Sequence, residues 1–231
     1  MVRMGSYYKF VAYDHQEALQ WYLKAAELND PVAQAMLGNM YADGEGVPQD
    51  HAEAFKWELK AAKQGIKEAQ GLVAMAYEGG DGVEQDFIEA MRWYKKAAEQ
   101  GDDKAQCLLG LMYYDGRLPQ DYSAAFNWFL KAVEQDNDLA QYYLGEMYYN
   151  GEGVAQNFPN ALKWIRKSAE QGNDSAQARL GAMYADGDGV PQDDAEAVKW
   201  LLKAAEKDNP NALLVLGFMY EEGRGVPQDA S

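Results

Sequence analysis

The stretch that decides the fold is "GEGVPQDHAEAFKWELKAAKQG", residues 44–65, because near copies of it return along the chain. Loops of the same kind begin at Gly80, Gly151, Gly187 and Gly223, with a shortened one at Gly116. The six tryptophans, Trp21, Trp57, Trp93, Trp128, Trp164 and Trp200, are separated by 36, 36, 35, 36 and 36 residues. A constant period of about 20 to 50 residues is typical of solenoids and repeat arrays.

Each unit contains two segments with helical periodicity. In the first, Ala54, Trp57 and Ala61 recur three and four positions apart, as on one face of an amphipathic helix. Asp50 and Glu53 form a D-x-x-E capping box at its start. The box returns at Asp14/Glu17, Asp86/Glu89 and Asp193/Glu196.

The second segment reads "PVAQAMLGNMYADG" from Pro31, with Asp30 as the expected cap. Gly65, Gly101 and Gly172 are expected to end three helices in the left-handed conformation, with Asn29, Asp136 and Asp208 in that role elsewhere. No stretch has the pattern of a strand, so the sequence predicts an all-α fold. The loops between helices are expected to set helix angles, and residues such as Val47 are expected to fill the helix junction.

Composition limits the classes of partner. The chain has 231 residues, and 21 basic against 37 acidic residues give a net charge of -16, which repels phosphate backbones and anionic membranes. We therefore expect no nucleic-acid partner and no membrane insertion, since no segment has about 18 consecutive apolar residues. Localisation stays unknown: cytoplasmic as written, or periplasmic or secreted if a leader has been removed.

The repeated pattern resembles the Sel1-like repeat, a relative of the tetratricopeptide repeat. In one complete unit the matching residues are Ala33, Leu37, Gly38, Tyr41, Gly44, Gly46, Val47, Asp50, Ala54, Trp57, Lys60, Ala61, Ala62 and Gly65. The resemblance implies an α-solenoid of antiparallel helix pairs forming a right-handed superhelix, with the "LGxMY" helices on the concave side. It also implies that the chain binds proteins or peptides.

Some bacterial relatives link each helix pair by a disulfide, which the single Cys107 excludes here. Stability must then come from stacking of small residues between helices. On this basis Trp128→Ala is expected to cost about 3 to 5 kcal/mol.

The repeats predict one domain. Residues 1–13 are expected to form an N-terminal tail that could be a cloning remnant, and 14–229 a single array. The array divides into an orphan helix at 14–28, five complete repeats over about 31–208, and a partial repeat at 210–229. Because neither end has a polar cap, head-to-tail self-association is expected, with truncation of a longer array as the alternative.

Candidate catalytic and metal motifs fail on spacing. The stretch from Asp186 departs from a calcium loop at Val190 and Ala197. The H-x-E sequences at His15 and His51 lack the P-C-x-x-C partner of a zinc deaminase. We therefore predict no enzyme activity, no cofactor and no metal.

The concave surface is the predicted binding site. In the first complete unit its register includes Val32, Ala35, Asn39, Ala42 and Asp43. Further along, the same register gives Cys107, Leu111, Tyr114, Leu139, Tyr142, Glu146, Tyr149, Asn150, Leu214 and Phe218.

Tyrosines beside carboxylates favour a basic or amphipathic protein or peptide. The alternative, given equal weight, is that some of these rings fill the spaces between repeats. The sequence thus predicts a noncatalytic adaptor that uses this groove. The alternatives are a self-assembling block joined head to tail and a regulator of a cell-envelope enzyme.

Overall fold

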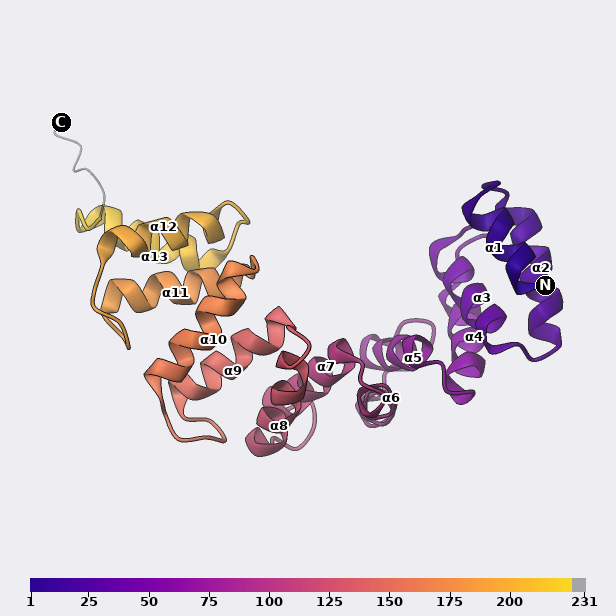
Figure 1. Ribbon diagram of the computed structural model, residues 1–231, viewed down its shortest axis with the longest axis horizontal. Helices are drawn as coiled ribbons and strands as arrows, with labels where there is room; N and C mark the ends of the chain where they lie inside the picture. The colour runs from indigo at the N-terminus through magenta and orange to yellow at the C-terminus, as the bar shows by residue number, and fades with distance from the viewer. Residues whose placement is uncertain (226–231) are drawn as a thin grey trace. The chain divides into compact units, whose positions relative to one another are not determined.

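The computed structural model describes residues 1–225, and all regular secondary structure in this part of the chain is helical (Figure 1). The helices are α1 (Val2–Phe10), α2 (His15–Glu27), α3 (Pro31–Asp43), α4 (His51–Lys63), α5 (Lys67–Gly79), α6 (Phe87–Glu99), α7 (Asp103–Tyr114), α8 (Tyr122–Val133), α9 (Asp138–Asn150), α10 (Phe158–Glu170), α11 (Asp174–Asp186), α12 (Asp194–Ala205) and α13 (Pro210–Glu221). Consecutive helices pack in pairs as a repeat solenoid, which confirms the predicted all-helical class. The right-handed superhelix stays a prediction.

The expected caps form. The side chains of Asp14, Asp50, Asp86 and Asp193 each accept a hydrogen bond from the backbone N–H of the glutamate three residues later. Asp30 likewise accepts from the N–H groups of Val32 and Ala33. The non-glycine helix ends at Asn29, Asp136 and Asp208 adopt φ angles of 63°, 66° and 58°. Local sequence signals therefore determine where the helices begin and end.

The chain divides into two compact units, unit 1 at Met1–Pro119 and unit 2 at Gln120–Ser231. Unit 1 contains α1 to α7, and unit 2 contains α8 to α13. The predicted partial repeat at 210–229 includes α13, but its residues 226–229 lie outside the described part of the chain.

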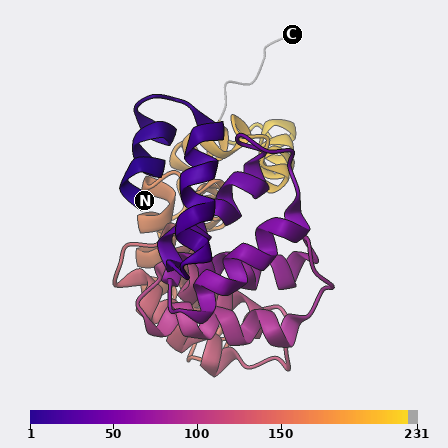
Figure 2. The same ribbon diagram turned by 90° about the vertical axis from the view of Figure 1, so that its right-hand side faces the viewer.

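The N-terminus differs from the sequence prediction of a tail followed by an orphan helix. Residues 2–10 form α1, which lies beside α2 in both views (Figure 2). A Cβ on Gly5 would lie 2.6 Å from the Tyr22 ring, and Lys9 Nζ lies 2.6 Å from Glu45 Oε2. Helix α1 has neither a tryptophan nor a side-chain cap, so the signals that mark the other helices are missing.

In each tryptophan-containing helix, the residue directly after the tryptophan is a large buried side chain. This position, which we call the core slot, holds Tyr22, Glu58, Tyr94, Phe129, Ile165 and Leu201, all buried. Only Trp93 among the indoles is buried, while the other five are half-buried. A lysine three residues later covers several of these rings, as Lys60 does at 3.6 Å from the Trp57 ring centroid. The indoles therefore lie at the edge of the core, partly exposed to solvent, and the residues of the core slot pack in its interior.

The recurring loops join neighbouring repeats. A Cβ on Gly46 would lie 2.7 Å from the His15 carbonyl oxygen, and a Cβ on Gly82 would lie 2.2 Å from the His51 carbonyl oxygen. Both glycines also have positive φ angles, of 74° and 70°. The loop thus presses on the first residue of a helix in the preceding repeat, and only glycine fits there.

Glutamines connect helices within a repeat and between repeats. In unit 1, Gln64 Nε2 donates to Gln34 Oε1 and Gln100 Nε2 donates to Gln70 Oε1, each at 2.7 Å. Gln70 in turn donates to the Ala62 carbonyl of the preceding helix at 3.2 Å. The two glutamine pairs join the two helices of one repeat, whereas the bond from Gln70 to Ala62 joins neighbouring repeats. Together they satisfy polar groups of the buried Gln34 and Gln70.

Candidate binding surfaces

Three cavities lie along the "LGxMY" helices of unit 1. We call the largest, of about 440 Å³, the Glu58 pocket; its walls include Asp43, His51, Phe55, Glu58, Met75 and Asp81. A second cavity of about 310 Å³ is lined by Val32, Ala35, Asn39, Glu58, Glu68 and Leu72. The third, of about 340 Å³, is lined by Gly71, Leu72, Met75, Tyr94 and Leu108, among others. Leu72 contributes to all three cavities, so they form one series along α3, α5 and α7.

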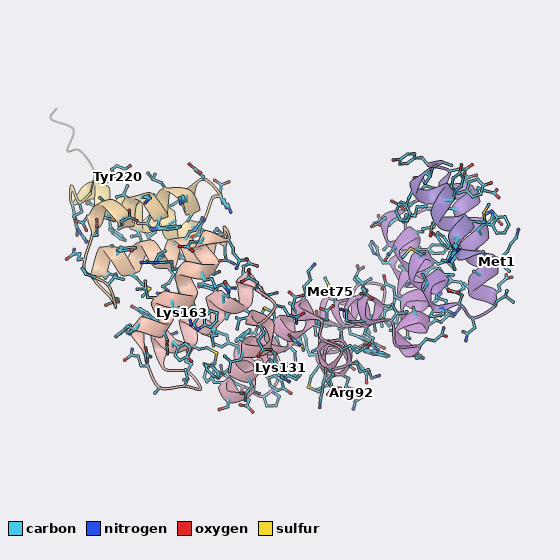
Figure 3. All side chains as sticks on the ribbon, in the orientation of Figure 1. Met1, Met75, Arg92, Lys131, Lys163 and Tyr220 are labelled. Carbon is cyan, nitrogen blue, oxygen red and sulfur yellow. The ribbon has the colours of Figure 1, made fainter. Side chains whose placement is uncertain are left out.

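The surface around these cavities is apolar and exposed. Val32 is 44% exposed, Leu72 36% and Met75 54%. Met75 on α5 and Arg92 on α6 lie on opposite sides of their helix pair (Figure 3). Exposed side chains on the α5 side are therefore available to a partner. Arg92 lies on the opposite face of the helix pair, away from the cavities.

Glu58 stands between the first two cavities. Glu58 as a whole is 7% exposed, and burial together with Asp81 and Asp43 raises the pKa of its carboxyl group to about 7. Burial dominates because an ionised carboxylate loses its hydration there. This pocket therefore holds a carboxyl group that is only partly ionised near neutrality.

Unit 2 gathers a different set of groups. Glu146 is 6% exposed and accepts a hydrogen bond from Arg179 Nε at 2.6 Å, with a second ion-pair contact to Arg179 Nη2. The Arg179 guanidinium lies 5.0 Å from the Tyr149 ring centroid, and the Tyr149 hydroxyl donates to Asp188. The hydrogen bond to Asp188 is the main reason why the pKa of Tyr149 is raised to about 12.

Arg179 also borders a cavity of about 260 Å³, together with Tyr142, Ala178, Ala182 and Val215. Burial raises the pKa of Tyr142 to about 12, so its hydroxyl stays protonated. On this surface Arg179 is paired with Glu146, and Tyr149 is paired with Asp188.

The residues predicted for the groove differ in their exposure and in whether they line a cavity. Asn39 and Tyr142 line cavities, and Tyr142, Glu146 and Tyr149 gather around Arg179. Cys107 and Leu111 are buried, Tyr114 and Leu139 are half-buried, and Asn150, Leu214 and Phe218 are exposed. Cys107 and Leu111 thus belong to the protein interior rather than to an open surface.

Sequence reasoning missed Glu58 and Arg179. Glu58 lies on the tryptophan-containing helix, outside the register used to predict the groove, yet it lines two cavities. A comparison of the core slot between repeats would have found it, because Glu58 is the one charged residue there. Arg179 would have been found by comparing its own position on the "LGxMY" helices between repeats. Its equivalents carry no charge; they are Met36, Leu72, Leu108, Tyr143 and Val215.

The family model of the Sel1 repeat matches the whole chain, over residues 1–30, 31–66, 67–102, 103–137, 138–173, 174–209 and 210–231. The chain belongs to the Sel1 repeat family. The first matched segment contains both α1 and α2, so α1 is part of a repeat.

Solved structures agree with this family. A Sel1 repeat protein from Oxalobacter formigenes is 31% identical, with a TM-score of 0.88 over 99% of this chain and 93% of that one. The c5321 protein of uropathogenic Escherichia coli, a protective antigen with an SLR fold, is 38% identical with a TM-score of 0.84. That match covers 91% of this chain, which spans only 45% of the c5321 chain. The immunity protein PA5088 of Pseudomonas aeruginosa, 21% identical with a TM-score of 0.53 over 84% of this chain and 74% of its own, shares the fold alone.

No curated protein matches the chain significantly. Among residues 1–225, no helix has the length and apolar character needed to span a membrane. The same residues contain no group of three or more His, Cys, Asp or Glu side chains placed to hold a metal ion.

Proposed function

We propose that this Sel1 repeat protein is a noncatalytic adaptor that binds a protein or peptide along the "LGxMY" helices. The observation that carries the proposal is the series of three cavities along α3, α5 and α7, with exposed Leu72 and Met75 between them. Concave apolar surfaces with a few polar groups are typical of binding sites. Sel1 repeat proteins are in general noncatalytic scaffolds that mediate protein interactions.

The chemistry of unit 1 favours a basic or amphipathic partner. Asp43, Glu58, Glu68 and Asp81 line the same cavities as the apolar side chains. An amphipathic segment can place apolar groups on Leu72 and Met75 and a positive charge beside the carboxylates. The net charge of -16 also speeds association with a positively charged partner.

Site-specific photo-crosslinking tests the adaptor role. A photoreactive phenylalanine analogue replaces Met75 in one variant and Arg92 in a matched control, in cells that express the protein naturally. We expect discrete protein adducts from position 75 that are lost when Leu72→Lys is added, and none of these adducts from position 92. Equal crosslinking from both positions, or adducts insensitive to Leu72→Lys, would contradict a role for this surface.

The alternative function, self-assembly from head to tail, is favoured by one observation. Exposed apolar side chains occur on α1, where Tyr7 is 51% and Phe10 59% exposed, and on α13, where Leu214 is 60% and Phe218 56% exposed. A contact between two such different faces propagates rather than closing into a dimer.

Light scattering over a concentration series tests self-assembly. If α1 of one molecule binds α13 of another, mass rises with concentration and Phe218→Glu returns the protein to monomer. A monomer at every concentration rejects the self-assembly alternative.

A further inference from the structure

The core slot holds a glutamate in one repeat and a large apolar residue in the others. Tyr22, Tyr94, Phe129, Ile165 and Leu201 are at most 1% exposed. Glu58 occupies the same position on α4, and a Cβ added to Gly38 of α3 would lie 2.5 Å from its Cγ. Its methylene groups therefore pack against α3 as an apolar side chain would. This packing does not explain why the position carries a carboxylate.

The Glu58 carboxylate lacks a partner of opposite charge. Among the described residues, no hydrogen bond or ion pair reaches it, although it is only 7% exposed. Buried carboxylates are costly unless they are paired, so an unpaired one that opens into two cavities indicates a ligand. Both the Glu58 pocket and the second cavity use Glu58 as part of their wall.

The charged groups around Glu58 are mainly acidic. Asp43 at the end of α3 and Asp81 after α5 both act on Glu58 electrostatically. Glu68 of α5 lines the second cavity. His51 of α4 lies with its Nδ1 3.2 Å from Asp81 Oδ2, so the one nearby base is directed to Asp81 rather than to Glu58. Within the part of the chain that the structure describes, the pocket thus has an excess of negative charge and no cation directed at Glu58.

We propose that the Glu58 pocket binds the guanidinium of an arginine in the protein partner, with flanking apolar residues of the partner on Leu72 and Met75. This rests on the proposed adaptor function and names the chemistry of the bound group. The volume of about 440 Å³ and the walls of Phe55 and Met75 suit a long side chain that is apolar along its stem and charged at its tip.

Arginine fits better than other cationic groups. Its guanidinium is weakly hydrated, remains charged, and can donate two parallel hydrogen bonds to a carboxylate. Binding would keep Glu58 ionised, so a proton held by Glu58 leaves when the arginine enters. Affinity therefore rises with pH through the pKa of about 7.

The test compares two peptides that differ only in charge. Acetyl-Leu-Arg-Leu-amide is titrated into the full chain against acetyl-Leu-citrulline-Leu-amide, in which citrulline keeps the shape of arginine without its charge. Binding is followed by the NMR signal of the Met75 methyl group, at about pH 8 and about pH 6. The same titrations are made on Glu58→Gln, which keeps the shape of the side chain, and on Lys56→Ala as a control on the same helix.

We expect the arginine peptide to bind the native chain at least about ten-fold more tightly than the citrulline peptide at the higher pH. Its affinity should fall up to about ten-fold at the lower pH as Glu58 becomes protonated. Glu58→Gln should reduce both differences to about two-fold, and Lys56→Ala should leave them as they are.

Two results would overturn the inference: equal binding of both peptides to the native chain, or an arginine preference that survives in Glu58→Gln. Either result leaves the adaptor function standing if crosslinking at position 75 still captures a protein that position 92 does not. Conversely, discrimination between the peptides without such capture would support the pocket and reject the adaptor function.

Discussion

Unit 1 and unit 2 each bury a glutamate to a similar depth, but only one of the two carboxylates has a partner among residues 1–225. Glu146 of unit 2 is 6% exposed and is held by Arg179, whereas Glu58 of unit 1 is 7% exposed and unpaired. The ion pair with Arg179 neutralises the charge of Glu146 within the fold, so Glu146 adds little attraction for an external cation. The same repeat scaffold therefore supports a paired glutamate in unit 2 and an acidic pocket around Glu58 in unit 1.

The largest expected effect comes from moving the glutamate into unit 2. Ile165 fills the core slot of α10, is fully buried and packs against Gly145, as Glu58 packs against Gly38. Ile165→Glu would place a carboxylate at a position that is 0% exposed, which we expect to destabilise unit 2 by about 5 kcal/mol at about pH 8. Helical content and urea unfolding measure the loss.

The matched control is Ile165→Gln, which introduces a polar group of similar size without a charge. We expect it to cost less than the glutamate at about pH 8 and a similar amount at about pH 5, where the glutamate is neutral. If the two variants are equally stable at about pH 8, the core slot of unit 2 tolerates a charge and the contrast with Glu58 fails.

Removing the partner of Glu146 should have the next largest effect. Arg179→Met leaves Glu146 buried and unpaired, and we expect unfolding to require about 3 kcal/mol less free energy. Adding Glu146→Met should restore most of the loss, because no buried charge then remains. A double variant as unstable as Arg179→Met alone would show that packing, rather than charge, is responsible.

Glu58→Leu should stabilise unit 1. The pKa of Glu58 is raised from 4.5 to about 7 in the folded chain, so folding favours its protonated form. Glu58 therefore destabilises the fold least below about pH 4.5, where it is protonated in both the folded and the unfolded chain. The free energy of unfolding then falls as pH rises from about 4.5 to about 7. Replacing it with leucine, as at Leu201, should raise stability by about 2 kcal/mol at about pH 8 and much less at about pH 4.

Urea unfolding of the native chain and of Glu58→Leu at both pH values measures this difference. A gain that does not change with pH would mean that Glu58 keeps an ordinary pKa. Together with the peptide titration, the measurement separates the cost of the unpaired carboxylate from its use in binding.

The fold was predictable from the sequence because its signals are local and repeated. The tryptophan spacing gave the repeat period, and Asp50 or Asn29 marks a helix boundary through contacts within a few residues. Helix α1 was missed because it carries none of these signals and is held by contacts with α2, through Gly5 and Tyr22.

The candidate site was less predictable because it depends on burial and pairing between helices. The register of the "LGxMY" helices includes Asn39 and Tyr142, which line cavities, but it could not tell that Cys107 is buried. Glu58 belongs to a helix that a simple groove register leaves out. Glu146 is paired with Arg179, which lies 33 residues further along the chain. A local sequence pattern does not extend over that separation.

The smallest expected effect concerns an unpaired polar atom of unit 2 that carries no charge. Gln141 of unit 2 accepts from Gln171 Nε2 at 2.9 Å, but the buried Gln177 Oε1 has no partner among the described residues. The equivalent of Gln171 in the next repeat is Lys207, which instead donates to the Gly172 carbonyl. Lys207→Gln should complete the missing hydrogen bond and stabilise unit 2 by about 0.5 to 1 kcal/mol, since the exposed bond to Gly172 is lost in exchange.

Hydrogen exchange at the amides of α11 and α12 measures this gain, with Lys203→Gln as the control because Lys203 covers the Trp200 ring and lies outside the glutamine series. Slower exchange in Lys207→Gln but not in Lys203→Gln supports the role of the glutamine pairs in joining the two helices of a repeat. Equal exchange in both would mean that the unpaired amide oxygen costs little. The effect should be far smaller than that of an unpaired carboxylate at the same depth, because a neutral amide loses much less hydration energy on burial than an ionised group does.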